Sequence, residues 1–380
     1  MTQTNINNVQ ATRKHMIVAI ACISGILLAV NIAVSIWRYQ ATPWFSMDYA
    51  YMRVASFHAL AISIGVLVAL MIQLLNSKGK EWFVIPAYAA ILCFGTYIAV
   101  FGIDGRYLGG RVTYFTPAMM YAALFVSSYA ATKDFGKLWH KCVALLLIFA
   151  LPVLLAELGS HSVSVGFTLC ATFIVLLIKS FFIDEKQRHR WTVVLALSAA
   201  IFALFITCGG SEMVGALTTR LETFMSGGRT DPTGAGYVYH QLLNGFRDAK
   251  FVGTSRYEIA INSAYSIPAY AFFAKQDSAY SVAAVILKWG WLSGVFMLAL
   301  TVALEVLLFK LSRLARNDYA RYFSYSVAVL FAVKTVFSVV SCFAVFVGEA
   351  DMPMIGAFGG VVDVTLIASV AALCGSGTQE

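Results

Sequence analysis

The sequence has little charge and few groups arranged for metal binding. Only 12% of its 380 residues are charged, whereas soluble domains carry about 25%. Its seven cysteines form no CxxC pair, and no cysteine or histidine stands at the spacing of a metal site. A metal-centred or disulfide-rich fold is therefore not expected, and we interpret the cysteines as small apolar packing residues.

Long hydrophobic runs dominate the chain instead. Hydrophobic residues make up 60% of it, which is more apolar surface than a soluble fold can bury. A helix of about 20 residues crosses the hydrocarbon core of a bilayer. Runs of roughly this length lie at 16–37, 54–75, 82–101, 115–131, 142–158, 162–183, 191–208, 280–309, 322–346 and 354–374. The predicted fold class is all-α: a polytopic membrane protein of about ten transmembrane helices, with residues 1–380 forming a single membrane domain.

The short loops between these runs carry unequal positive charge. One set of alternating loops holds fifteen Lys and Arg residues, and the opposite set holds four. Because positively charged loops stay in the cytoplasm, both termini are predicted to be cytoplasmic in a bacterial inner membrane, with the first run as an uncleaved signal anchor. The net charge of +8 is dispersed among these loops, so nucleic-acid binding is not expected.

One connection, residues 209–279 between the seventh and eighth runs, is much longer than the others and is predicted to be a large extracytoplasmic loop. Such loops are usually functional. Within it, Val238, Leu242, Leu243 and Phe246 share one helical face. This spacing predicts a short helix, either lying in the membrane interface or packed within the loop.

Glycine, proline and positive charge are concentrated in this loop. Residues 227–237 are rich in Gly and Pro, which predicts fixed turns. The surrounding basic residues are Arg220, Arg229, Arg247, Lys250, Arg256 and Lys275. Cations at a membrane surface suit anionic headgroups or a lipid diphosphate. The alternative is that a long loop escapes the charge rule without any ligand.

Three motifs resemble the SEDS family (shape, elongation, division and sporulation), which includes FtsW, RodA and SpoVE. The first is Arg220-Leu221-x-x-Phe224 followed by Asp231-Pro232-x-Gly234-x-Gly236-Tyr237, Gln241 and Gly253. The second is Gly105-Arg106 with Phe115-Thr116-Pro117, and the third is Met352-Pro353 with Gly359-Gly360. The resemblance extends from about residue 47 to residue 373. The family's architecture, ten spans with a large outer loop after the seventh, agrees with the predicted topology.

This resemblance implies glycan polymerisation in cell-wall synthesis for cell shape or division. SEDS proteins are glycosyltransferases that join lipid II, an undecaprenyl-diphosphate-linked disaccharide peptide, into peptidoglycan at the outer face of the membrane. They work with a class B penicillin-binding protein. A divalent cation would fit beside the diphosphate, but no ligand set for it can be identified.

The resemblance also suggests roles for individual residues. Asp277 would be the general base that deprotonates the attacking sugar hydroxyl. Arg106, Arg220 and Arg229 would hold the diphosphate, while Asp231 and Tyr237 would shape the loop. Gln241 and Lys288 are further candidate substrate-binding residues.

Several positions depart from the family pattern. The family's catalytic aspartate lies eleven residues before a glycine that opens the eighth span. That glycine corresponds to Gly290 here, so the aspartate position is Ala279, and Asp277 lies two residues earlier. The Ser-Glu that follows the family's proline is Ala118-Met119. Two alternatives therefore stay open: a catalytically inactive scaffold for a penicillin-binding protein, or a transporter of lipid-linked precursors.

Four ionisable residues fall within predicted spans, namely Lys288, Glu305, Lys334 and Asp363. A charge near the middle of a bilayer is costly, so such groups usually pair or line cavities. Lys288 lies near the outer end of its run, where its long side chain could reach the interface. Lys334 and Asp363 could pair across neighbouring helices. A transporter would need such groups as a polar path.

Overall fold

The computed structural model is predominantly helical in the part of the chain that it describes. It describes residues 3–40, 47–76, 93, 107–108, 111–112, 218, 222–227, 229, 235–262, 265–276, 280–315, 318–343, 352–355 and 359–375. The helices are α1 (Gln3–Gln40), α2 (Met47–Asn76), α10 (Ala235–Asp248), α11 (Ala269–Gln276), α12 (Ser281–Trp289), α13 (Trp291–Arg313), α14 (Asp318–Cys342) and α15 (Gly359–Gly375). The strands are β1 (Tyr107–Leu108), β2 (Arg111–Val112), β3 (Glu258–Asn262) and β4 (Tyr265–Pro268), and they form two antiparallel hairpins.

The prediction of a polytopic helical membrane protein is confirmed. Among the described residues, four helices are long and apolar enough to cross a membrane, and they lie within α1, α2, α13 and α14. The last helix, α15, is a shorter apolar helix. Apart from Cys93, the five predicted spans between 82 and 208 lie outside the described residues, so the total of ten spans stays a prediction.

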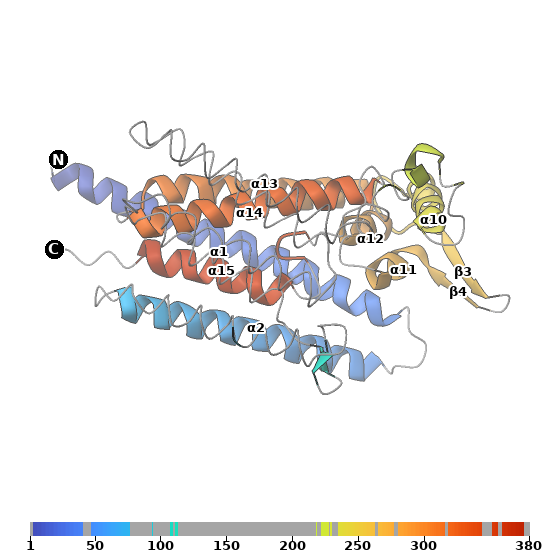
Figure 1. Ribbon diagram of the computed structural model, residues 1–380, viewed down its shortest axis with the longest axis horizontal. Coiled ribbons are helices and arrows are strands. Elements are labelled where there is room, and N and C mark those ends of the chain that lie inside the picture. The colour runs from blue at the N-terminus through green and yellow to red at the C-terminus, as the bar shows by residue number, and fades with distance from the viewer. Residues whose placement is uncertain are drawn as a thin grey trace.

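The long helices form an elongated bundle with two distinct ends (Figure 1). α13 and α14 pack side by side, α15 packs against α14 and α1, and α2 lies along α15. The close approach of α2 to α15 depends on Gly65, where a Cβ atom would stand 2.9 Å from Cγ1 of Val364. Small residues permit such contact between membrane helices.

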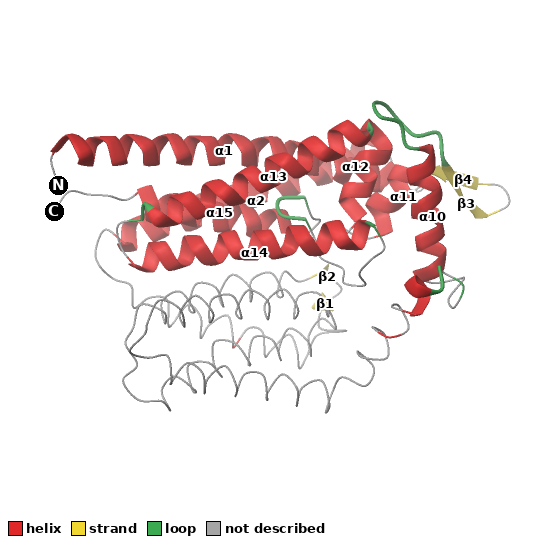
Figure 2. Cartoon of the chain, turned by 90° about the horizontal axis from the view of Figure 1, so that it is seen from above, coloured by secondary structure: helices red, strands yellow, loops and turns green. Residues whose placement is uncertain are grey.

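The start of α1 and the end of α15 lie at the same end of the bundle, which we call the terminal end (Figures 1 and 2). Arg13 holds this end together. Its guanidinium donates to the carbonyl oxygens of Cys374, at 3.2 Å, and Leu314, at 2.9 Å. Carbonyl groups at the C-terminal ends of helices lack intrahelical donors, so one cation serves the ends of both α13 and α15.

The elements α10, β3, β4, α11 and α12 gather at the opposite end, which we call the loop end (Figure 1). The prediction of one continuous span over 280–309 is wrong, because the helix is interrupted at Gly290. That residue has φ 98° and ψ 172°, a conformation essentially restricted to glycine. The run is therefore divided into the short helix α12 and the spanning helix α13.

Candidate functional site at the loop end

α10 is the helix predicted within the long loop, and it lies across the loop end of the bundle (Figure 2). Leu242 is buried, while His240, Asn244 and Arg247 are exposed, as the apolar spacing predicted. α10 packs on α12, and a Cβ atom at Gly245 would lie 3.2 Å from Cδ2 of Leu287. The helix is therefore a packed part of the loop end. Its depth in the membrane interface stays a prediction.

The turn after α10 is organised by Asp248. One carboxylate oxygen of Asp248 accepts hydrogen bonds from the Ser255 hydroxyl at 2.7 Å and from the backbone N–H groups of Arg256 at 2.7 Å and Tyr257 at 2.9 Å. These donors favour the ionised form. The Ser255 hydroxyl, followed by the Arg256 N–H, lowers the pKa of Asp248 below its ordinary value of 3.8. Asp248 is therefore an anionic turn residue and a poor proton acceptor.

Two predicted site residues, Gln241 and Tyr237, face the β3–β4 hairpin. The Tyr257 hydroxyl donates to Oε1 of Gln241 at 2.5 Å and receives a longer bond from Nδ2 of Asn244 at 3.5 Å. The Tyr237 hydroxyl donates to the carbonyl oxygen of Ala260 at 3.5 Å, and its ring lies edge-on to Phe272. Both residues thus help to hold the hairpin against α10.

The segment 250–255 runs along the junction of α12 and α13 and forms hydrogen bonds with the backbone groups of that junction. Gly253 and Ser255 donate their N–H groups to Trp289 and Leu287, at 3.0 and 2.8 Å. In return, Trp291 and Leu292 donate to Lys250 and Phe251, at 3.0 and 3.1 Å. The interruption at Gly290 is therefore hydrogen-bonded on both sides rather than left open.

Lys288 lies in an aromatic cluster between α1, α11 and α12. Its Nζ stands 4.1 Å from the centroid of the Tyr270 ring, a cation–π arrangement. Trp37 contacts both Tyr270 and Trp289 edge-on. Lys288 thus lies at the end of α12 with its ammonium group over an aromatic ring. Its reach into an interface stays a prediction.

Arg38, at the end of α1, lies near this cluster and reaches α11. Its Nε donates to the carbonyl oxygen of Ala274 at 2.8 Å. That carbonyl belongs to the last turn of α11, where backbone acceptors have no intrahelical donor. Arg38 therefore fixes the last turn of α11. Its acceptor, Ala274, precedes the predicted base Asp277 by three residues in the sequence.

Basic and acidic residues are nearly balanced at the loop end. Between residues 222 and 292 the sequence contains six Lys and Arg residues and five Asp and Glu residues. The cations are Arg229, Arg247, Lys250, Arg256, Lys275 and Lys288; the acids are Glu222, Asp248 and Glu258, with Asp231 and Asp277 outside the described residues. All of these cations except Lys288 are exposed. The exposed cations suit an anionic ligand.

Of the remaining predicted site residues, one is described by the structure and four are not. Arg229 is exposed, on the segment that precedes α10. Arg106, Arg220, Asp231 and Asp277 lie outside the described residues, so their roles stay predictions. No group of three metal-ligating side chains occurs among the residues that the structure describes.

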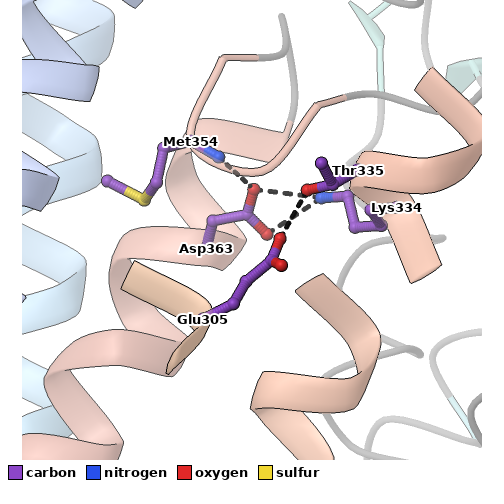
Figure 3. A network of polar contacts seen from close by, with 5 residues as sticks. All are labelled: Glu305, Lys334, Thr335, Met354 and Asp363. Atoms are coloured by element: carbon purple, nitrogen blue, oxygen red, sulfur yellow. Dashed lines mark hydrogen bonds and ion pairs between the residues drawn. The ribbon is translucent and has the colours of Figure 1, made fainter. Parts of the chain in front are cut away.

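A second polar cluster joins buried side chains of α13, α14 and α15 (Figure 3). Nζ of Lys334 on α14 is 3.0 Å from both carboxylate oxygens of Asp363 on α15, which confirms that these residues pair. The adjacent Thr335 donates its hydroxyl to Oε1 of Glu305 on α13 at 2.6 Å. α14 is thus joined by polar contacts to both neighbouring helices.

Asp248, Tyr257 and Arg38 were not identified from the sequence as site residues. Asp248 had a weak signal, since an acidic residue five positions before Gly253-Thr254-Ser255 can accept hydrogen bonds from the backbone N–H groups of a following turn. Arg38 also had a signal of its own, because a basic residue at the outer end of the first run opposes the positive-inside rule. Tyr257 had no signal, because its partners on α10, Asn244 and Gln241, precede it by 13 and 16 residues and meet it only when the loop folds back.

Comparison with known proteins identifies the fold. No protein-family model and no curated protein sequence matches the chain. The crystal structure of the rod shape determining protein RodA of Thermus thermophilus superimposes with a TM-score of 0.57 and 15% identity, over 94% of this chain and 95% of that one. A mutant of the same RodA gives a TM-score of 0.58 and 16% identity over 94% and 96% of the two chains.

A third similar structure belongs to a peptidoglycan synthase complex that coordinates polymerization and crosslinking. It has a TM-score of 0.58 and 15% identity, over 91% of this chain and 96% of that one. All three likenesses cover almost the whole of both chains, and they agree with the resemblance of the loop motifs. The chain is a multi-pass helical membrane protein with the fold of RodA.

Proposed function

We propose that this protein is a SEDS-type peptidoglycan glycosyltransferase that polymerises lipid II at the outer face of the bacterial cytoplasmic membrane. The observation that carries the proposal is the RodA fold over 94% of the chain, together with the loop motif from Arg220 to Gly253. On this proposal the loop end faces outward and the terminal end lies in the cytoplasm.

The charge of the loop end supports a diphosphate-linked substrate. Five of its cations, Arg229, Arg247, Lys250, Arg256 and Lys275, are exposed, and Arg side chains suit the bidentate binding of phosphate oxygens. Arg229 and Lys288 are the described residues that we assign to the diphosphate, with Arg106 and Arg220 as further ligands. Gln241 and Tyr237 hold the hairpin that borders this region.

A glycosyl transfer of this kind needs a carboxylate that accepts the proton of the attacking hydroxyl. Asp248 is occupied by three donors, and Glu258 accepts a hydrogen bond from the Ser266 hydroxyl. Glu222 is the remaining acid in the described part of the loop end. We assign the general base to Asp277 because the family resemblance implies it, and Asp231 to shaping the loop.

The proposed partner is a class B penicillin-binding protein. The support comes from the similar structure found in a synthase complex that coordinates polymerization and crosslinking. The membrane lipid surrounding the bundle would hold the undecaprenyl tail. A divalent cation beside the diphosphate is part of the proposal, but the described residues offer no ligand set for it, so no catalytic step is assigned to it.

The test is polymerisation of purified lipid II by the purified protein, with and without its cross-linking partner. Wild type should form glycan strands, and Asp277→Asn should form none. Glu222→Gln is a matched control that removes an exposed carboxylate of the same loop and should retain the wild-type rate. Addition of EDTA in the same assay tests the divalent cation.

The scaffold alternative is favoured by one observation, the displacement of the catalytic aspartate relative to the family pattern. It predicts no glycan from wild type or Asp277→Asn while an active control enzyme forms product in the same assay. It also predicts that Asp277→Ala preserves function in cells, whereas disruption of the Asp231–Tyr237 turn abolishes it.

A further inference from the structure

The ion pair between Lys334 and Asp363 is buried within the helix bundle. The two side chains are only 10% and 1% exposed, and the ammonium group contacts both carboxylate oxygens at 3.0 Å. Loss of either partner alone would leave an uncompensated charge in a medium of low dielectric constant, which is strongly destabilising. The presence of such a costly pair inside the bundle therefore calls for a structural or functional explanation.

The Asp363 carboxylate has a second partner that gives this reason. It accepts the backbone N–H of Met354 at 2.8 Å (Figure 3). Met354 belongs to the turn Met352–Ile355, which precedes α15 and is closed by the Ile355 N–H donating to the Met352 carbonyl oxygen at 3.0 Å. All four residues of the turn are buried.

The turn is held in an unfavourable backbone conformation. Met354 has φ 66°, a left-handed value that residues with side chains seldom adopt. Its N–H is buried, and a buried N–H without an acceptor is costly. Asp363 supplies the acceptor, and the charge on that acceptor makes the hydrogen bond stronger than one between neutral groups.

We propose that Asp363 is the positioning residue of this buried turn and that Lys334 is its counter-ion, so that the pair forms a latch between α14, α15 and the turn. Both carboxylate oxygens and the ammonium group are engaged in these contacts, which fits a fixed latch better than a step in a polar path for transport. The inference goes beyond the proposed glycosyltransferase activity and does not depend on it.

Hydrogen–deuterium exchange of the Met354 amide in the purified full-length protein tests the latch. The informative variant is Lys334→Met/Asp363→Leu, which removes both charges together and replaces them with apolar side chains, a change that buried ion pairs often tolerate. We expect the Met354 amide to exchange about 10-fold faster or more in this variant, because it loses a hydrogen bond to a charged acceptor. The melting temperature shows whether the bundle itself remains folded.

Thr335→Val is the matched control. It alters the residue next to Lys334 and removes the bond to Glu305, but it leaves the latch intact, so Met354 should exchange at the wild-type rate. A double variant with wild-type exchange at Met354 would show that Asp363 does not hold the turn. Equal acceleration in Thr335→Val would also overturn the proposal, since it would indicate general loosening of the bundle. Neither readout involves lipid II, so a failure here is distinct from a failure of the proposed activity.

Discussion

Gly290 lies in direct contact with the backbone of Phe251, although 39 positions separate them in the chain. A Cβ atom at position 290 would stand 2.6 Å from the carbonyl oxygen of Phe251. The contact is possible only because glycine has no side chain and tolerates φ 98°. The same carbonyl accepts the N–H of Leu292 at 3.1 Å, so the two segments cannot separate without losing hydrogen bonds.

Substitution of Gly290 by alanine should therefore destabilise the loop end. The backbone conformation alone costs about 1–3 kcal/mol for a residue with a side chain, and the clash with Phe251 adds to this. We expect a lower melting temperature and faster amide exchange in residues 250–255 of Gly290→Ala. Gly25→Ala on α1 is the control, because a Cβ atom there meets nothing within 4 Å. Equal stability of the two variants would contradict this account of the junction.

Asp248 should make the turn after α10 sensitive to acid. Its pKa is lowered in the folded protein, first by the Ser255 hydroxyl and then by the Arg256 N–H. A carboxyl group with a lowered pKa stabilises the fold above its unfolded pKa, and this contribution is lost as the pH falls through the folded value. We expect the amides of Arg256 and Tyr257 to lose protection only once the pH falls below the ordinary aspartate pKa of 3.8.

Asp248→Asn provides the comparison for this acid response. It should show reduced protection of the same amides already at neutral pH, with a smaller further loss in acid, because the titrating group is absent. Glu222→Gln should keep the wild-type pH profile, since Glu222 lies outside this turn. A wild-type profile in Asp248→Asn would show that another group controls the turn.

Arg38 should stabilise the end of α11. Arg38→Met removes the donor to the Ala274 carbonyl oxygen, and a hydrogen bond to a charged group contributes about 1.5–3 kcal/mol. We expect faster amide exchange in the last turn of α11. Lys275→Met, which removes an exposed cation from the same turn, should change stability by no more than about 0.5 kcal/mol. Similar exchange in both variants would mean that Arg38 acts only through its charge.

The cations of the loop end should strengthen binding of undecaprenyl diphosphate. Arg229→Gln should weaken binding to protein in nanodiscs by about 2- to 5-fold, as expected for an exposed charge pair, with a larger effect at low salt. Lys288→Gln removes a half-buried cation and should weaken binding at least as much. Lys310→Gln is the control, because Lys310 is exposed in the last turn of α13 at the terminal end. Equal weakening by all three variants would show that the lipid has no preferred end.

The spanning helices could be predicted from the sequence because the bilayer sets their length. The run at 322–346 corresponds to α14 (Asp318–Cys342), and the run at 354–374 corresponds to α15 (Gly359–Gly375). The pairing of Lys334 with Asp363 could also be anticipated, since a charge within a span requires a partner. These features follow from solvation, which acts on each segment separately.

The family resemblance places Gly290 at the start of the eighth span, but hydrophobic spacing did not predict the interruption, because residues 280–309 are predominantly apolar and a single glycine is tolerated in a helix. The break depends on the approach of residues 250–253, a contact that hydrophobic spacing does not encode. Asp248 was missed for a similar reason, since its three donors meet only when the following turn closes. The placement of Asp277 and Arg106 lies outside the described residues and stays a prediction.

Arg13 has a consequence for the order in which the molecule is assembled. It lies on the first helix, yet its acceptors, Leu314 and Cys374, lie 301 and 361 residues further along the chain. The ribosome must therefore add 361 residues after Arg13 before this guanidinium meets its second carbonyl. The contact thus forms long after α1 has been synthesised, and deletion of residues 1–14 should fray the ends of α13 and α15.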